Sequence, residues 1–170
     1  MLNNPVDDPI ARRVAIHELG HGATYFLIYH QAESVAVYST DGIWEGQQPP
    51  PLDPPLGGQP SSEKEWLDVI AWTCGGWAAV HLAIRLKLLP PANEAQPGDN
   101  GYLGPMPADE GCAIEFARRS GAADPAALVE KGRQQALDRL GPHMMALWDL
   151  VPDLISRGYV DGSEIEQACR

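Results

Sequence analysis

Proline most restricts how this chain can fold, because it decides where helices begin and where they must end. The 170-residue sequence holds 16 prolines. Pro49-Pro50-Pro51 and Pro54-Pro55 exclude a helix and a central strand, since proline has no backbone N–H and its ring fixes φ. We therefore expect surface loops over 47–60 and over 90–107, with the regular structure of the chain lying outside them.

The segments outside these loops carry the start and stop signals of helices. Asp8-Pro9 opens the first, because aspartate can cap a helix and proline fits its first turn, and apolar residues recur at helical spacing to about Tyr29. Ser62 and Glu65 have the spacing of a capping box, which predicts a second helix that Pro90-Pro91 ends. Further helices are expected from near Asp109 to Gly121, from Asp124-Pro125 to Gly141-Pro142, on to Gly158 with a break or kink at Pro152, and after Asp161-Gly162.

One short segment favours strands instead. The β-branched run from Ser34 to Tyr38 is followed by the turn dipeptide Asp41-Gly42 and by Ile43-Trp44, which together predict a β-hairpin. The chain is thus expected to form one mainly α domain over 1–170, with a small hairpin or edge strand next to the first helix. Such an edge strand can bind an extended peptide, or it can serve only as a small lid over the core.

The composition excludes several classes of partner. The 12 basic and 23 acidic residues give a net charge of −11, which disfavours binding to nucleic acid and to anionic membrane surfaces. No run is apolar enough to span a membrane, and the N-terminal residues lack the pattern of a signal peptide, so we expect no membrane insertion by this chain. The three cysteines, Cys74, Cys112 and Cys169, are odd in number and far apart, which favours a reducing, cytoplasmic location.

The motif that carries chemistry is His17-Glu18-Leu19-Gly20-His21, in the middle of the first predicted helix. Residues four apart lie on one helix face, so two imidazoles at this spacing can bind one zinc ion, and the glutamate beside the first can act as a general base. A metal would also offset the cost of burying two unpaired histidines in an apolar helix. The alternative is that His17 and His21 are ordinary solvent-facing residues.

A catalytic zinc site takes a third protein ligand, and the sequence leaves its identity open. The longer pattern HExxHxxGxxH is excluded, because Thr24 and Leu27 stand where it needs glycine and histidine. An acidic ligand on a later segment remains. Glu94 lies in a proline-flanked loop, whereas Asp109 lies in the first turn of a helix, where the helix dipole alone would favour an acid. The acidic candidates are Glu94, Asp99, Asp109, Glu110 and Glu115.

Gly75-Gly76 is unusual because it falls inside the second predicted helix. Two glycines there cost up to about 2 kcal/mol of helix propensity. We expect this cost to be offset by a close approach between the second helix and the helix that carries His17 and His21.

The order of these motifs resembles the peptidase domain of the FtsH family of ATP-dependent zinc proteases, over roughly residues 11–166. In that family an HEAGH helix is followed by a strand and hairpin, then a helix containing GGRAAEE, then a helix that begins ND and continues to AR, and an LDGEEI segment near the end. The matching segments here are HELGH at 17–21, Glu33 to Tyr38, Gly75-Gly76-Trp77-Ala78-Ala79, Asp109 with Ala117-Arg118 at the family's spacing, and Val160-Asp161-Gly162-Ser163-Glu164-Ile165.

This resemblance implies a helical FtsH-peptidase-like fold with a Zn2+ ion held by His17, His21 and Asp109. It further implies a metallo-endopeptidase that hydrolyses peptide bonds by a zinc-bound water, which Glu18 activates, with a peptide or unfolded protein as substrate. The family's acidic pair is replaced by Val80-His81, so His81 either takes over the orienting role of the missing carboxylate or is a core histidine.

The sequence holds no GxxxxGK[ST] pattern, so this chain by itself is expected to act without ATP. Whether it works with an ATPase partner or as a homo-oligomer stays open. Two other functions are consistent with the same residues. One is a catalytically silent interaction domain with this fold, and the other is a zinc protease of another HELGH family that acts on one partner protein.

Overall fold

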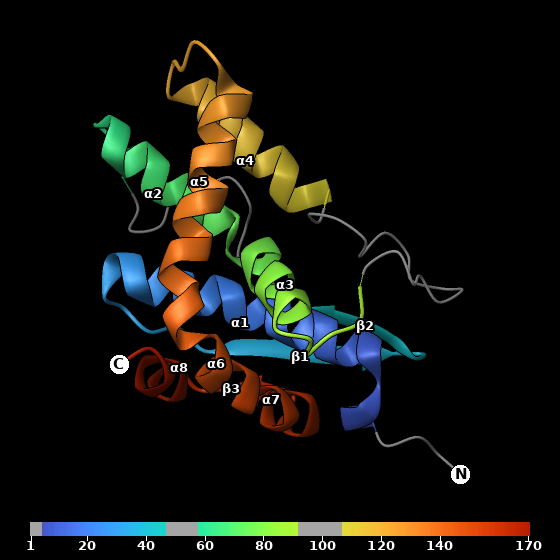
Figure 1. The fold of residues 1–170 in the computed structure, drawn as a ribbon. Coiled ribbons are helices and arrows are strands. Elements are labelled where there is room, and N and C mark those ends of the chain that lie inside the picture. Colours follow the sequence, from blue (N-terminus) through green and yellow to red (C-terminus); the bar gives the residue numbers. More distant parts are fainter. Residues whose placement is uncertain (1–4, 47–57, 92–106) are drawn as a thin grey trace.

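A computed structural model describes residues 5–46, 58–91 and 107–170 (Figure 1). These residues are mainly helical, with one small antiparallel sheet, which confirms the expected class. Residues 47–57 and 92–106, and with them most of the two predicted loops, lie outside the described residues. The helices are α1 (Pro9–Tyr29), α2 (Glu63–Thr73), α3 (Gly75–Arg85), α4 (Pro107–Arg119), α5 (Pro125–Leu140), α6 (Met144–Asp149), α7 (Val151–Arg157) and α8 (Gly162–Ala168), and the strands are β1 (Val35–Thr40), β2 (Ile43–Gly46) and β3 (Tyr159–Val160).

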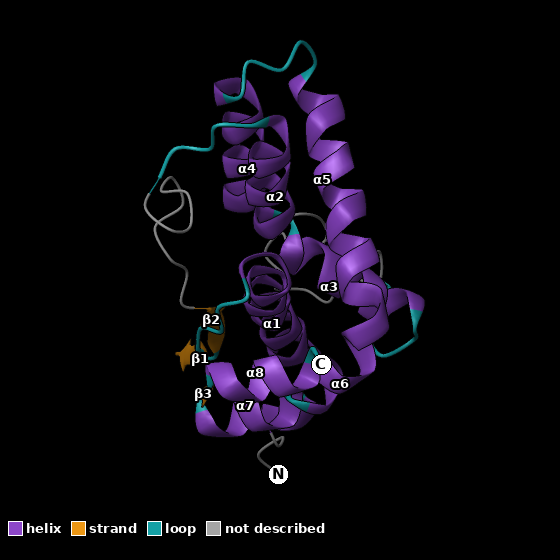
Figure 2. Cartoon of the chain, turned by 90° about the vertical axis from the view of Figure 1, so that its left-hand side faces the viewer, coloured by secondary structure: helices purple, strands orange, loops and turns teal. Residues whose placement is uncertain are grey.

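Helix α1 is the centre of the molecule. It lies between α2, α4 and α5 on one side and α6 to α8 on the other, while the sheet flanks it (Figures 1 and 2). Most of its length is buried, including the apolar residues Val14, Ile16 and Leu19. A helix covered on all sides is apolar all round, so the polar residues that it does bury need a specific partner.

The predicted helix starts are confirmed by their capping contacts. The Asp8 carboxylate accepts a hydrogen bond from the backbone N–H of Ile10 at 2.9 Å, and α1 ends at Tyr29 as expected. Ser62 and Glu65 form the reciprocal capping box of α2. These contacts satisfy backbone donors that have no partner within the helix, and each is worth roughly 1 kcal/mol.

The predicted hairpin is also present, and it is part of a larger sheet. Asp41 and Gly42 have φ values of 53° and 81°, the backbone of a tight hairpin turn between β1 and β2. The strand order is β2-β1-β3, with both pairs antiparallel, so β2 forms one edge. The strand β3 was not predicted, because two residues give no alternating pattern to recognise.

The prediction of one helix from Ser62 to Pro90 is wrong. The segment breaks at Cys74 into α2 and α3, whose axes are bent by 56°, and α3 ends at Arg85. Gly75 and Gly76 therefore begin α3 and do not lie inside a longer helix. The end at Arg85 is set by the chain turning back at Lys87, which has a φ of 60° and closes the helix before the prolines are reached.

Glycines explain why α3 starts where it does, because they let its first turn contact α1 directly. A β-carbon at Gly20 would overlap the carbonyl oxygen of Gly75 and stand 2.6 Å from the β-carbon of Ala79. A β-carbon at Gly75 would lie 2.6 Å from the hydroxyl oxygen of Thr24. The expected close approach between Gly75-Gly76 and the motif helix is thus confirmed, and it sets the bend between α2 and α3.

The predicted helix between Gly141 and Gly158 is divided in the structure. A short 3-10 turn precedes α6, and α6 and α7 are separated at Leu150, so Pro152 lies in the first turn of α7. Proline is tolerated there because a first-turn residue has no helical N–H bond to lose. A break near Pro152 was expected, and it falls two residues earlier.

Within the described part of the chain, no single helix combines the length and the apolar character that crossing a membrane requires; only α2 and α3 taken together, across their bend, would meet that test.

The close α1–α3 contact predicts how glycine substitutions change the free energy of unfolding. Gly20→Ala should lower the free energy of unfolding by about 1–3 kcal/mol, because the added methyl group has no space beside Gly75. The matched control is Gly111→Ala in α4, where nothing lies within 4 Å and alanine should stabilise the helix by roughly 0.5–1 kcal/mol. Urea unfolding of both variants checks this, and equal effects of the two changes would contradict the packing described.

Candidate metal centre

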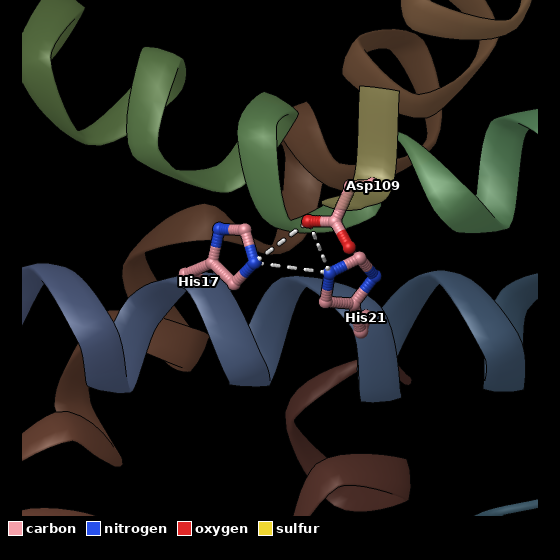
Figure 3. Close-up of side chains that lie close together, drawn as sticks. All are labelled: His17, His21 and Asp109. Carbon is pink, nitrogen blue, oxygen red and sulfur yellow. Dashed lines mark hydrogen bonds and ion pairs between the residues drawn. The ribbon is translucent and has the colours of Figure 1, made fainter. Parts of the chain in front are cut away.

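His17 and His21 on α1 point to the same side and meet Asp109 from the first turn of α4 (Figure 3). The Nε2 atoms of the two histidines are 3.1 Å apart, and both face the Oδ2 atom of Asp109, at 3.0 Å from His17 and 3.3 Å from His21. Three ligand atoms from two segments far apart in sequence thus converge on one point.

This group is almost fully enclosed by protein. The exposed fractions of the side chains are 5% for His17, 14% for His21 and 10% for Asp109. Among the described residues, these three form a group that could hold a metal ion, and the same contacts are those of an ion pair between a protonated histidine and the carboxylate. Either state offsets the free-energy cost of burying these polar groups, which is high for groups without partners.

A backbone carbonyl orients the His21 ring. Nδ1 of His21 lies 3.1 Å from the carbonyl oxygen of Trp72, near the end of α2. A carbonyl oxygen only accepts hydrogen bonds, so Nδ1 carries the proton and donates it. In the neutral ring this leaves the lone pair on Nε2, directed at the other two ligand atoms, which is the arrangement that metal-binding histidines use.

The start of α3 fixes the ring of His17. A β-carbon at Gly76 would overlap the His17 ring and would lie 2.6 Å from both of its nitrogens. The glycine therefore lets the α3 backbone press on the imidazole and hold it in place. The same helix start that contacts Gly20 thus also shapes the site, about one turn earlier along α1.

Burial and mutual contacts shift the ionisation of all three groups. Burial would raise the pKa of Asp109, but its hydrogen bonds with His17 and His21 outweigh burial and hold this pKa well below its usual range. Burial opposes the charged form of His21 as well, yet the contact with the Asp109 carboxylate raises the pKa of His21 to about 9. The pKa of His17 is lowered, mainly by burial, so near neutral pH and without metal His21 carries the positive charge that pairs with the Asp109 carboxylate.

Glu18 lies beside this group and faces the sheet. It is buried, and burial raises its pKa to about 7, with the nearby charges of His21 and Asp109 acting in opposite directions. Its carboxylate occupies the space beside Gly46 at the end of β2, where any β-carbon would overlap it. A carboxyl group with a pKa near 7 can both accept and return a proton at neutral pH.

The structure separates Asp109 from two of the other acidic candidates for a third ligand. Glu110 forms an ion pair with Arg133 at 2.9 Å, and Glu115 lies 4.0 Å from Arg118 on the surface of α4. Glu94 and Asp99 lie outside the described residues. Of the candidates whose positions are described, only Asp109 joins His17 and His21.

His81 does not belong to the group that converges on Asp109. Its ring stacks on Trp77 with 5.1 Å between the ring centroids. The guanidinium group of Arg133 also lies over Trp77, at 5.3 Å from the centroid of the Trp77 ring.

Two features that shape the site could not be read from the motifs in the sequence. The Trp72 carbonyl carries no side-chain signal, whereas Gly46, a glycine at the end of a strand, is a recognised sign of close backbone approach.

A scan against models of known protein families matched none of them, and no curated protein sequence matched this chain.

The electrostatics of the group predict a pH dependence in the metal-free protein. His21 should titrate with a pKa of about 9 by NMR, and Asp109→Asn should lower this pKa to its ordinary value or below, because burial then acts without the carboxylate. The stability that this pair contributes is fully present below pH 6.5 and is lost as the pH rises through about 9. Glu115→Gln, on the exposed face of α4, is the control, and an unchanged His21 pKa in Asp109→Asn would contradict the contact.

Proposed function

We propose that this protein is a zinc-dependent metallo-endopeptidase in which His17, His21 and Asp109 bind Zn2+ and Glu18 is the general base. The observation that carries the proposal is the convergence of three ligand atoms within 3.0–3.3 Å of one another. Atoms bound tetrahedrally to zinc at about 2.0–2.1 Å are roughly 3.3 Å apart, so the observed spacing suits a single zinc ion.

The donor atoms suit zinc and leave one coordination position of the ion free. Two imidazoles and one carboxylate are typical ligands of catalytic zinc, and three protein ligands leave one coordination position for water or substrate. When bound, zinc supplies Lewis acidity that polarises a carbonyl group and lowers the pKa of a coordinated water to about 7. The Trp72 carbonyl supports this arrangement because it accepts the Nδ1 proton of His21, so that the neutral ring presents the lone pair of Nε2 to the metal.

The remaining roles, proton transfer and positioning of the metal ligands, belong to side chains of α1 and α4. Glu18, which is buried next to His17 on α1, would accept a proton from the attacking water and later return it to the leaving amine. Its burial excludes bulk water from the carboxylate, which keeps the proton available for the reaction. Asp109 and the two histidines keep fixed positions because each comes from a helix packed into the core.

The edge position of β2 supports an extended peptide as the substrate. One side of β2 pairs with β1, which leaves its other side without a strand partner among the described residues, and its last residue, Gly46, touches Glu18. Pairing with a strand edge recognises backbone more than side chains, so unfolded segments of many sequences could bind. We further propose that the chain is related to the peptidase domains of FtsH-type proteases. In this proposal it acts in the cytoplasm, and by itself it hydrolyses peptide bonds without ATP.

Replacement of the proposed base tests this function. Glu18→Gln should keep one zinc per chain, because glutamine changes no ligand, and should lower the hydrolysis of unfolded casein by about 100-fold or more. Zinc content by plasma mass spectrometry and release of fluorescent casein fragments measure the two results. Hydrolysis by Glu18→Gln at the parent rate would contradict the mechanism. A parent protein that binds zinc and cleaves nothing would instead indicate a catalytically silent domain.

A further inference from the structure

Gly46, the last residue of β2, stands against the side chain of Glu18. A β-carbon at this position would overlap Oε1 and Cδ of Glu18 and would lie 2.5 Å from its Cγ. The carboxylate therefore fills the space that any side chain at position 46 would need. Glycine inside a strand lowers strand stability and marks a position where another group approaches the backbone closely.

Neighbouring contacts fix the place of Gly46. It pairs with Val37 of β1, which is 3% exposed and belongs to the hydrophobic core. Trp44, two residues earlier on the same face of β2, packs against that core. The backbone N–H of Val37 also donates to the carbonyl oxygen of Gly158 at 2.9 Å, which ties β1 to the segment before β3. The strand cannot retreat from Glu18 without disturbing these contacts.

The other side of the contact is equally constrained. Glu18 extends from the buried middle of α1, next to His17, so its backbone cannot move without moving the proposed ligands. The outer atoms of the Glu18 side chain are the most flexible part of the pair. We therefore expect a side chain at position 46 to displace the carboxylate before it moves the backbone of either element.

We propose that Gly46 is a positioning residue that holds the Glu18 carboxylate in its working orientation through direct contact with the strand backbone. This inference rests on the proposed function for its catalytic meaning, but the contact itself exists without a metal or a substrate. It also links the hairpin to the proposed base, because a change in the position of β2 reaches Glu18 through one residue.

The test compares Gly46→Ala with Gly58→Ala, a glycine with open space around it. Gly46→Ala should retain one zinc per chain and lower kcat on casein peptides by about 100-fold with KM changed less than about threefold, since a base displaced by about 1 Å loses catalytic power but not substrate binding. Gly58→Ala should keep the parent kcat. In the Glu18→Gln background, Gly46→Ala should cause no further loss, because the group through which it acts is gone.

A second measurement does not depend on catalysis. In the metal-free protein, the carboxyl 13C resonance of Glu18 should shift in Gly46→Ala and stay at its parent position in Gly58→Ala. A parent kcat together with an unmoved Glu18 resonance in Gly46→Ala would overturn the proposal. If the parent protein cleaves nothing, the proposed function fails while the resonance still decides the role of Gly46. If Gly46→Ala does not fold, Gly46→Ala combined with Glu18→Ala should fold, and failure of that variant would overturn the proposal as well.

Discussion

The close contact between α1 and the first turn of α3 is the constraint on which the rest of the structure depends. Gly20 and Gly75 allow the two backbones to meet, and this contact requires the chain to bend at Cys74. The bend places the end of α2 so that the carbonyl of Trp72 meets His21, and it places Gly76 against the ring of His17. Small residues at one helix crossing thus orient both imidazoles.

Burial then gives the group its chemical character. Three polar side chains in a largely apolar interior would be costly unless a proton or a cation satisfied them together. In the metal-free state the shared positive charge on His21 does so, and it keeps Asp109 ionised. A divalent cation would take the place of that proton. In either state a positive charge, from the proton or from the metal ion, offsets the burial of these polar side chains.

Much of this arrangement could be predicted from the sequence, for physical reasons that differ from residue to residue. The helical spacing of His17 and His21 is a local property, and so are the caps at Asp8 and Ser62 and the turn at Asp41-Gly42. Asp109 is different, because spacing alone left five acidic candidates, and the choice among them came from the order of motifs along the chain. In the structure Asp109 lies beside His17 and His21, and its role as a ligand stays a prediction.

The rest could not be predicted because it depends on contacts between distant segments. The bend at Cys74 follows from packing on α1, which no local propensity contains, so one long helix was the natural expectation from the capping box and the prolines. The two-residue strand β3 is defined by its pairing with β1. The contact of Trp72 with His21 uses a backbone carbonyl, which every residue type has, so the sequence could not indicate it. Position 46 did carry a signal, since glycine is a poor strand residue.

The central claim is that a zinc ion lies among His17, His21 and Asp109, and anomalous diffraction at the zinc absorption edge tests it most directly. Crystals grown with one equivalent of zinc should show a single strong anomalous peak about 2.0–2.2 Å from the three ligand atoms. A peak elsewhere on the chain, or none at this position with the side chains ordered, would contradict the account.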